Sequence, residues 1–470
     1  MLYFQLDRQK EAIRNFGIVL DLQPTHAEAI FYRGRSWRMS GETDKALHDM
    51  DIAIKLAPRN PTYLKERATL RTETGDFPGA IEDWESVTEL QEDAQGFIQL
   101  GLLQIKTGVS EKAIRSFSSA IVHDPNSPLA YAQRGLLHLE SNNIPDARSD
   151  LDRSLLLSPN QPLTILASAR CEFHAGNPDR AIQRCSQLIQ LDRRSVDAHV
   201  LRGRIYIQRG DLDSAIKDLT TAIDLNKGHA EAFRLRGQAY FTLEKLSKAI
   251  EDLTRVIDIS PDDLPSLLLR GQIHMSVDMP DKAVEDFREV IQLEPEQLDA
   301  LRGRAQAFLL LEKHQASVAD WTSILAITPR DTTALVQRSR CHEQLAKFSE
   351  ALTDLDSAFA LDPTLEEKHK GERAELYLQR GSQSLSDGDW KDALADFTSA
   401  ITADEDARRD AEDAMAIVYR QRASQLFDNQ GLEAACADLD SCLKLRPEDK
   451  EALRIRGAIH IQLGNHQKAI

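Results

Sequence analysis

Residues 196–229 read VDAHVLRGRIYIQRGDLDSAIKDLTTAIDLNKGH, and residues 230–263 read AEAFRLRGQAYFTLEKLSKAIEDLTRVIDISPDD. Both stretches have 34 residues, with glycine eighth (Gly203 and Gly237), alanine twentieth (Ala215 and Ala249) and leucine four residues later. A small residue lets two helix backbones approach, and a large residue fills the space beside them. Each stretch is therefore predicted to form a helix, a turn and a second helix that packs against the first.

The same pattern recurs along the whole chain, and its clearest mark is an alanine about every 34 residues. These alanines are Ala12, Ala46, Ala80, Ala113, Ala147, Ala181, Ala215, Ala249, Ala283, Ala351, Ala393, Ala435 and Ala469, and Ser317 fills the one gap. Prolines follow most of the predicted second helices, because proline lacks the amide that a continuing helix requires. No linker rich in proline, glycine and serine interrupts the pattern, so the sequence predicts one continuous all-α solenoid over residues 1–470.

This spacing of small residue, alanine, large apolar residue and proline resembles the tetratricopeptide repeat, over essentially the entire chain. The resemblance implies a right-handed superhelical solenoid of antiparallel helix hairpins, with about twelve full repeats and half a repeat at each end. We expect a partial repeat at 1–26, regular 34-residue repeats over 27–363, two elongated 42-residue repeats over 364–449 and a partial repeat at 450–470. Because neither end carries a polar capping helix, more repeats or other domains are expected beyond both ends.

The two elongated repeats contain extra sequence near residues 365–373 and 407–415. Eight additional residues lengthen a helix by about two turns, or ~12 Å. Two interpretations stay open: the two extended first helices pack on each other, or they project as a rim that contacts a partner.

An internal covariation links the two helices of a repeat. With each repeat numbered so that the small residue is position 8, position 7 is arginine and position 23 is aspartate in ten of the twelve full repeats. The other two repeats have Leu100 with Ser116 and Ser168 with Arg184, so both partners are lost together. This joint loss predicts an ion pair within ~4 Å between the two helices of each hairpin.

Several classes of function are disfavoured by composition. The formal charge of -17 and the pI near 5.3 oppose binding to nucleic acid or anionic lipid, which needs a basic surface. No apolar run approaches the ~20 residues of a membrane span, and the first residues do not form a signal peptide. The five cysteines match no zinc or redox spacing, which favours a reducing, cytoplasmic location.

No catalytic, cofactor or metal site is expected from the sequence. It contains no phosphate-binding glycine loop, no dinucleotide fingerprint and no HExxH or GxSxG motif. Four histidines, His138, His274, His342 and His460, occupy position 11, but they are at least one repeat apart. We interpret them as hairpin core residues with satisfied hydrogen bonds.

The resemblance also implies a binding site, because first helices line the concave groove in this family and positions 2, 5, 9 and 12 face into it. The candidate peptide-binding residues are Arg170, Phe173, Arg204, Ile207, Arg234, Gln238, Phe241, Gln272, Met275, Arg302, Gln306 and Arg340. Their arginines are accompanied by no lysine–glutamate alternation that would neutralise them. One interpretation is that position 12 only seals neighbouring hairpins and the polar row is solvated. The other is that the apolar residues anchor a peptide whose carbonyls or carboxylates bind the arginines and glutamines.

The sequence therefore favours a non-catalytic scaffold that binds a protein or peptide segment with acidic and apolar side chains. The alternative is that these repeats form the substrate-recruiting region of a larger enzyme, such as a glycosyltransferase or a kinase, whose catalytic domain lies outside this chain.

Overall fold

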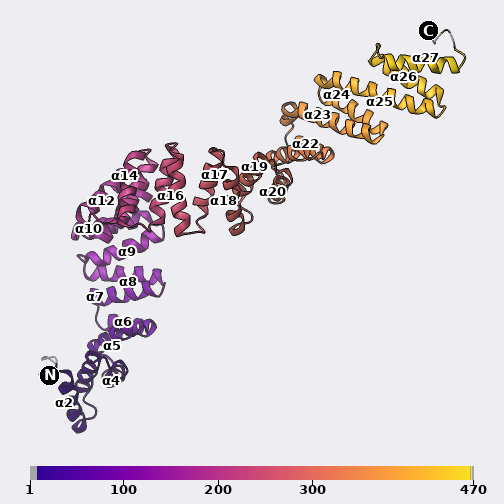
Figure 1. Cartoon of the computed structure of the whole chain (residues 1–470). Helices are drawn as coiled ribbons and strands as arrows, with labels where there is room; N and C mark the ends of the chain where they lie inside the picture. The colour runs from indigo at the N-terminus through magenta and orange to yellow at the C-terminus, as the bar shows by residue number, and fades with distance from the viewer. Residues whose placement is uncertain (1–7, 466, 468–470) are drawn as a thin grey trace. The chain divides into compact units, whose positions relative to one another are not determined.

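The computed structural model describes residues 8–465 and residue 467. These residues form 26 α-helices and one 3-10 helix and contain no strand, which confirms the predicted all-α solenoid of helix hairpins (Figure 1). The chain divides into two compact units, Met1–Ala239 and Tyr240–Ile470, and each is described by itself. Ala469 and the outer parts of both partial repeats lie outside the described residues.

The first unit contains one second helix, α2, followed by pairs of first and second helices. Their bounds are α2 (Gln9–Leu22), α3 (Ala27–Met39), α4 (Thr43–Leu56), α5 (Pro61–Thr74), α6 (Phe77–Leu90), α7 (Ala94–Lys106), α8 (Ser110–His123), α9 (Pro128–Glu140), α10 (Ile144–Leu157), α11 (Pro162–His174), α12 (Pro178–Leu191), α13 (Val196–Gln208), α14 (Leu212–Leu225) and α15 (Ala230–Thr242). The boundary between the two compact units falls inside α15.

The second unit continues the same alternation. Its helices are α16 (Leu246–Ile259), α17 (Leu264–Ser276), α18 (Pro280–Leu293), α19 (Leu298–Leu310), α20 (His314–Ile327), α21 (Thr332–Gln344), α22 (Phe348–Leu361), α23 (Thr364–Asp387), α24 (Trp390–Ala403), the 3-10 helix η1 (Glu405–Ala407), α25 (Arg408–Asp428), α26 (Leu432–Leu445) and α27 (Lys450–Gln462).

Contact between small and large residues sets the distance between the helices of a hairpin. The ring of Phe287 on α18 lies so close to α17 that a Cβ atom added to Gly271 would be 2.8 Å from it. A Cβ atom on Gly303 of α19 would be 2.5 Å from the same ring, so two glycines enclose Phe287. The serine that replaces the repeated alanine is satisfied, because the Ser317 hydroxyl donates to the Ala305 carbonyl at 2.9 Å.

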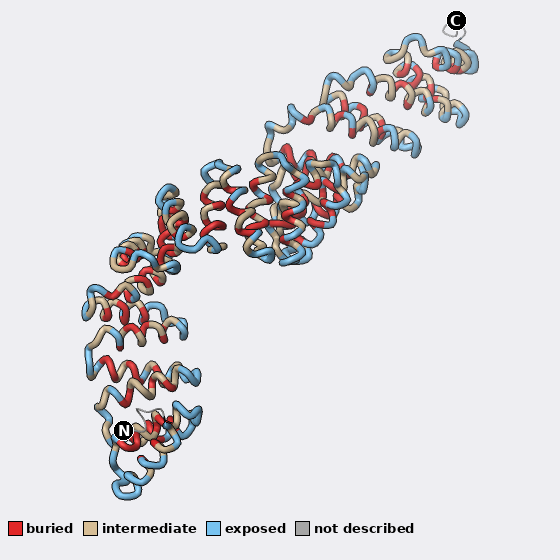
Figure 2. The backbone as a smooth tube through the Cα atoms, turned by 60° about the vertical axis from the view of Figure 1, so that its left-hand side comes forward, coloured by how far each residue is buried: buried red, intermediate tan, exposed pale blue. Residues whose placement is uncertain are grey.

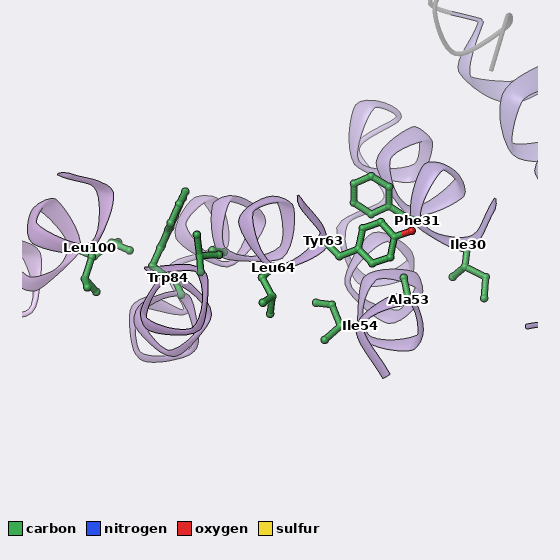
Figure 3. Close-up of a cluster of buried hydrophobic side chains, with 12 residues drawn as sticks. Ile30, Phe31, Ala53, Ile54, Tyr63, Leu64, Trp84 and Leu100 are labelled. Atoms are coloured by element: carbon green, nitrogen blue, oxygen red, sulfur yellow. The ribbon is translucent and has the colours of Figure 1, made fainter. Parts of the chain in front are cut away.

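The hydrophobic core continues from hairpin to hairpin. In the first unit the stacked rings of Phe31 and Tyr63 have centroids 4.4 Å apart, and Leu64 and Trp84 continue the cluster toward Leu100 (Figure 3). Buried residues face the neighbouring helices, whereas exposed residues gather at turns and outer faces (Figure 2). Each hairpin therefore buries part of its surface against the next, as a repeat protein requires.

The turns within hairpins share one backbone requirement. The residue at position 15 has a positive φ angle in every full repeat, and it is glycine in some, such as Gly210, and another residue in others, such as Glu312 and Ala346. A left-handed residue reverses the chain between two helices within a few residues.

The extra turns of the elongated repeats pack against the preceding hairpin. α23 has 24 residues and α25 has 21, and the two helices contact each other as other neighbouring first helices do, so both interpretations of their added turns stay predictions. Arg373, in the added part of α23, pairs with Asp356 of α22 at 2.9 Å, and its guanidinium group lies 5.6 Å from the centroid of the Phe359 ring. These contacts tie the added turns to the solenoid.

In the described part of the chain, no helix combines the length and the apolar character needed to cross a membrane. The same residues contain no group of three or more histidine, cysteine, aspartate or glutamate side chains placed to hold a metal ion.

Candidate functional site

The predicted arginine–aspartate pairs hold the scaffold that carries the site. In the first unit, Arg202 donates from Nε to Asp218 Oδ2 at 2.6 Å and from Nη2 to Oδ1 at 2.7 Å. The prediction is confirmed for Arg33–Asp49, Arg67–Asp83, Arg134–Asp150, Arg202–Asp218, Arg270–Asp286, Arg304–Asp320, Arg338–Asp354, Arg380–Asp396 and Arg422–Asp438. The tenth pair, Arg236 with Asp252, would join residues of the two compact units and stays a prediction.

The same arginines have a second partner that the sequence analysis missed. The Nη1 atom of Arg202 donates to the Ser186 hydroxyl at 2.8 Å, and Arg134 makes the equivalent bond to Ser118 at 2.9 Å. Each acceptor lies at position 25 of the preceding repeat. Position 25 is often serine, threonine or aspartate, all of which can accept a hydrogen bond, and this preference could have indicated the contact. The position-7 arginine therefore clamps its own hairpin and also joins it to the previous one.

Histidines also reach the buried aspartates. The Nδ1 atom of His199 lies 3.0 Å from Asp218 Oδ1, and His274 Nδ1 lies 2.9 Å from Asp286 Oδ2. Burial opposes ionisation of Asp218, but the hydrogen bonds from Arg202 and His199 outweigh it and lower the pKa of this carboxyl group. The buried aspartate is thus held as an anion within the hairpin.

The first helices of the first unit carry a basic cluster. We call the surface formed by α9, α11, α13 and α15 the first-helix face, and Arg170, Arg204 and Arg234 the arginine cluster. Burial lowers the pKa of Arg204, and the positive charges of Arg234 and Arg170 lower it further. The guanidinium groups of Arg170 on α11 and Arg234 on α15 therefore both act on Arg204 of α13.

Acidic neighbours correct one expectation about these arginines. The Arg204 guanidinium pairs with Glu231 of α15. In the second unit, Arg302 pairs with Asp331 at 2.8 Å and Arg340 pairs with Glu372 at 2.7 Å. The expectation that nothing neutralises the arginines is wrong for these three, because carboxylates on α15, immediately before α21 and on α23 pair with them. Within the described part of the first unit, Arg170 and Arg234 have no ion-pair partner.

Apolar side chains accompany the arginine cluster on the first-helix face. Phe173 and Ile207 are half-buried, and Phe173 packs against a core cluster that includes Leu201 and Ile205. At position 2, Leu163 is 78 % exposed and Leu129 is 43 % exposed. These two leucines were not among the candidate residues, although position 2 was among those expected to face the groove.

The remaining predicted residues divide between the two units. Gln238 is exposed on α15 in the first unit. In the second unit, Phe241 and Met275 are half-buried against core clusters, while Gln272 and Gln306 are exposed. The predicted binding residues therefore form two sets, one in each unit. The set on α11, α13 and α15 contains three arginines, more than the set in the second unit.

Comparisons with known proteins agree with the repeat pattern. The family model for the tetratricopeptide repeat matches residues 166–219, 200–263, 268–332 and 420–470. Human tetratricopeptide repeat protein 6 is 24 % identical over 131 residues, which are 28 % of this chain and 25 % of that protein. Mouse tetratricopeptide repeat protein 36 is 32 % identical over 109 residues, which are 22 % of this chain and 59 % of that protein. The matched part of the chain thus spans about a quarter to three fifths of these relatives.

Solved structures show similar helix hairpins at low sequence identity. The C-terminal part of a repeat protein from Cytophaga hutchinsonii is 19 % identical with a TM-score of 0.45, covering 51 % of this chain and 98 % of that one. The protein YrrB, described as having an unusual peptide-binding site, is 23 % identical with a TM-score of 0.36, covering 40 % of this chain and 97 % of its own.

Proposed function

Because the chain belongs to the tetratricopeptide repeat family, we propose that it is a non-catalytic scaffold that binds a peptide or protein segment on its first-helix face. Proteins of this family are in general protein-interaction scaffolds with protein or peptide partners. We place the ligand across α11, α13 and α15, and we assign it acidic and apolar side chains. The cytoplasmic location stays a prediction.

The arginine cluster is the observation that carries this proposal. Arg170, Arg204 and Arg234 bring three positive charges onto adjacent helices, and Glu231 pairs with one of them. The net positive charge stands out in a chain of formal charge -17. The positive charges of the arginine cluster repel one another. A ligand carboxylate between Arg170 and Arg234 would therefore reduce this repulsion and also form new ion pairs.

Apolar anchors would supply most of the affinity. Leu163 is 78 % exposed on the same helix as Arg170, seven residues away and so on nearly the same side of α11. Burial of such a side chain contributes about 1.5 to 3 kcal/mol before the costs of ordering the ligand. The two positions are about 10 Å apart along the helix axis, which an extended peptide spans in about three residues.

Affinity selection tests the proposal. A random peptide library displayed on phage is selected against the full chain and, in parallel, against a variant carrying Arg170→Glu and Arg234→Glu. Peptides that distinguish the two proteins should contain aspartate or glutamate about three residues from a leucine or phenylalanine. Neutral or basic peptides, or equal recovery on both proteins, would contradict the assignment of this face.

The choice of arginines follows from their contacts. Arg204 is left unchanged, because its removal would leave the partly buried Glu231 without its partner and confound binding with stability. A variant with Arg193→Glu and Arg194→Glu is the matched control. It makes the same change in net charge at exposed residues of the loop before α13, and its selected peptides should equal those of the unmodified protein.

A further inference from the structure

The repeat over residues 162–195 lacks the arginine–aspartate pair that ten of the other eleven full repeats share. Where they have arginine at position 7 and aspartate at position 23, this repeat has Ser168 on α11 and Arg184 on α12. Arg184 Nη2 lies 2.9 Å from Asp152 Oδ1, and Asp152 occupies position 25 of the preceding repeat. In this repeat the guanidinium group therefore comes from the second helix instead of the first, and it still contacts the preceding hairpin.

The other repeat that lacks the arginine–aspartate pair, 94–127, has no charged side chains in its place. Leu100 and Ser116 replace the pair there, and the Ser116 hydroxyl donates to Gln104 Oε1 at 2.8 Å in a buried, neutral contact. The 162–195 repeat instead keeps ionised side chains at the surface. Packing of a hairpin that lacks the arginine–aspartate pair therefore does not require these charged side chains.

A buried carboxylate forms the inner wall of this exceptional site. Glu172 of α11 is 2 % exposed and occupies position 11, where seven of the other eleven full repeats have histidine or an aromatic residue. It accepts hydrogen bonds from Arg148 Nε at 3.0 Å and from Asn177 Nδ2 at 3.0 Å. Arg180 lies farther away, with Nη1 3.5 Å from Glu172 Oε1, and its side chain is 62 % exposed.

Donors line the outer side of the same hollow, which has a volume of about 490 Å³. Arg180, Gln183, Arg184 and Gln187 are spaced i, i+3, i+4 and i+7 on α12, so they share one helix face. Three arginines, Arg148, Arg180 and Arg184, surround two carboxylates, Asp152 and Glu172, which leaves one positive charge in excess. Exposed Leu156 borders the hollow on α10.

We propose that this hollow between α10, α11 and α12 is a second docking point, which takes an aspartate or glutamate side chain of a partner protein with an apolar neighbour on Leu156. The incoming carboxylate accepts from Arg180 and from the Gln183 amide, while Arg148 and Asn177 continue to hold Glu172. Arginine suits this task because its planar fork offers a carboxylate two parallel donors. This site does not include the arginine cluster, so a ligand can bind in the hollow whether or not a ligand binds at Arg170, Arg204 and Arg234.

The test uses the full chain and a random twelve-residue phage library. Peptides are selected on the unmodified protein and counter-selected on Arg180→Ala, and those that distinguish the two are titrated by fluorescence polarisation. They should contain an acidic residue next to an apolar one and bind Arg180→Ala at least tenfold more weakly. Gln183→Glu, which adds a negative charge at an exposed residue, should weaken them by a similar factor. Unchanged circular dichroism must accompany both losses.

The variant with Arg170→Glu and Arg234→Glu separates this site from the first-helix face, because it should leave these affinities within about twofold. Selected peptides that are basic or neutral would overturn the proposal. So would peptides that lose affinity with the arginine-cluster variant, or a selection that yields no peptide able to distinguish Arg180→Ala.

Discussion

Arg202 and Asp218 lie 16 residues apart and join the two helices of one hairpin through two parallel hydrogen bonds of 2.6 and 2.7 Å. His199 Nδ1 lies 3.0 Å from Asp218 Oδ1 and donates a third hydrogen bond to the ionised carboxylate, and Ser186 of the preceding hairpin accepts a fourth hydrogen bond from Arg202. Asp218 is 6 % exposed, so hydrogen bonds from these partners replace the bonds to water that the carboxylate loses on folding. The pair fixes the angle of its own hairpin and its attachment to the one before.

Removal of this aspartate should destabilise the protein far more than removal of a surface partner. Asp218→Ala removes the acceptor of His199 Nδ1 and of the Nε and Nη2 donors of Arg202, and we expect it to lower the free energy of unfolding by about 2 to 3 kcal/mol. Asp152→Ala removes the partner of Arg184, whose pair is 30 % and 41 % exposed. It should cost less than about 1 kcal/mol. Urea denaturation followed by circular dichroism measures both, and equal costs would refute a structural role for the buried pair.

The lowered pKa of Asp218 predicts a pH dependence with a definite sign. The folded-state pKa lies below the unfolded value of about 3.9, so the stabilisation is fully present above about pH 5 and is lost as the pH falls through the folded value. Asp218→Asn cannot ionise. The difference in unfolding free energy between the two proteins should therefore shrink between pH 5 and pH 2. A difference that stays constant over this range would show that the charge of Asp218 does not stabilise the hairpin.

Close approach at Phe287 predicts opposite effects for two glycine substitutions. Alanine at position 271 places a methyl group 2.8 Å from the buried ring, and we expect a loss of about 1 to 3 kcal/mol despite the better helix propensity of alanine. Gly17 lies within α2 with nothing within 4 Å of an added Cβ, so Gly17→Ala should stabilise α2 by about 1 kcal/mol. Thermal unfolding of both variants distinguishes crowding from propensity, and a stabilising Gly271→Ala would contradict the close approach.

Much of the scaffold could be predicted from the sequence because the repeats act as internal copies. Positions 7 and 23 pair inside a hairpin and change together, while the small residue at position 8 stays small because it lies against positions 20 and 24, so both patterns reveal contacts. Contacts between hairpins were harder to predict, as the partners of Arg204, Arg302 and Arg340 show. Glu231 and Glu372 lie in the repeat after that of their arginines, whereas Asp331 is the last residue of the same repeat as Arg302, so no common spacing identifies the three carboxylates.

Thiol reactivity should follow burial. Burial raises the pKa of Cys171 to about 11 and that of Cys185 to about 12, so both are almost entirely protonated at pH 8. Cys436 is half-buried, with Sγ 3.7 Å from His460 Nε2. An aromatic disulfide reagent at pH 8 should modify Cys436 fast in the native protein and the buried cysteines only after unfolding. A fast phase that persists in Cys436→Ser would show that another thiol is accessible.

Peptide binding to the arginine cluster is tested most directly by one titration. The probe is a fluorescein-labelled peptide with a leucine three residues from a pair of glutamates, made in both orders, and its affinity is measured by fluorescence polarisation. Arg170→Glu combined with Arg234→Glu should weaken binding at least tenfold while the thermal melt stays unchanged, and Arg193→Glu combined with Arg194→Glu should leave the affinity within about twofold. Equal affinity for all three proteins, or equal weakening by both double variants, would contradict a binding site on α11, α13 and α15.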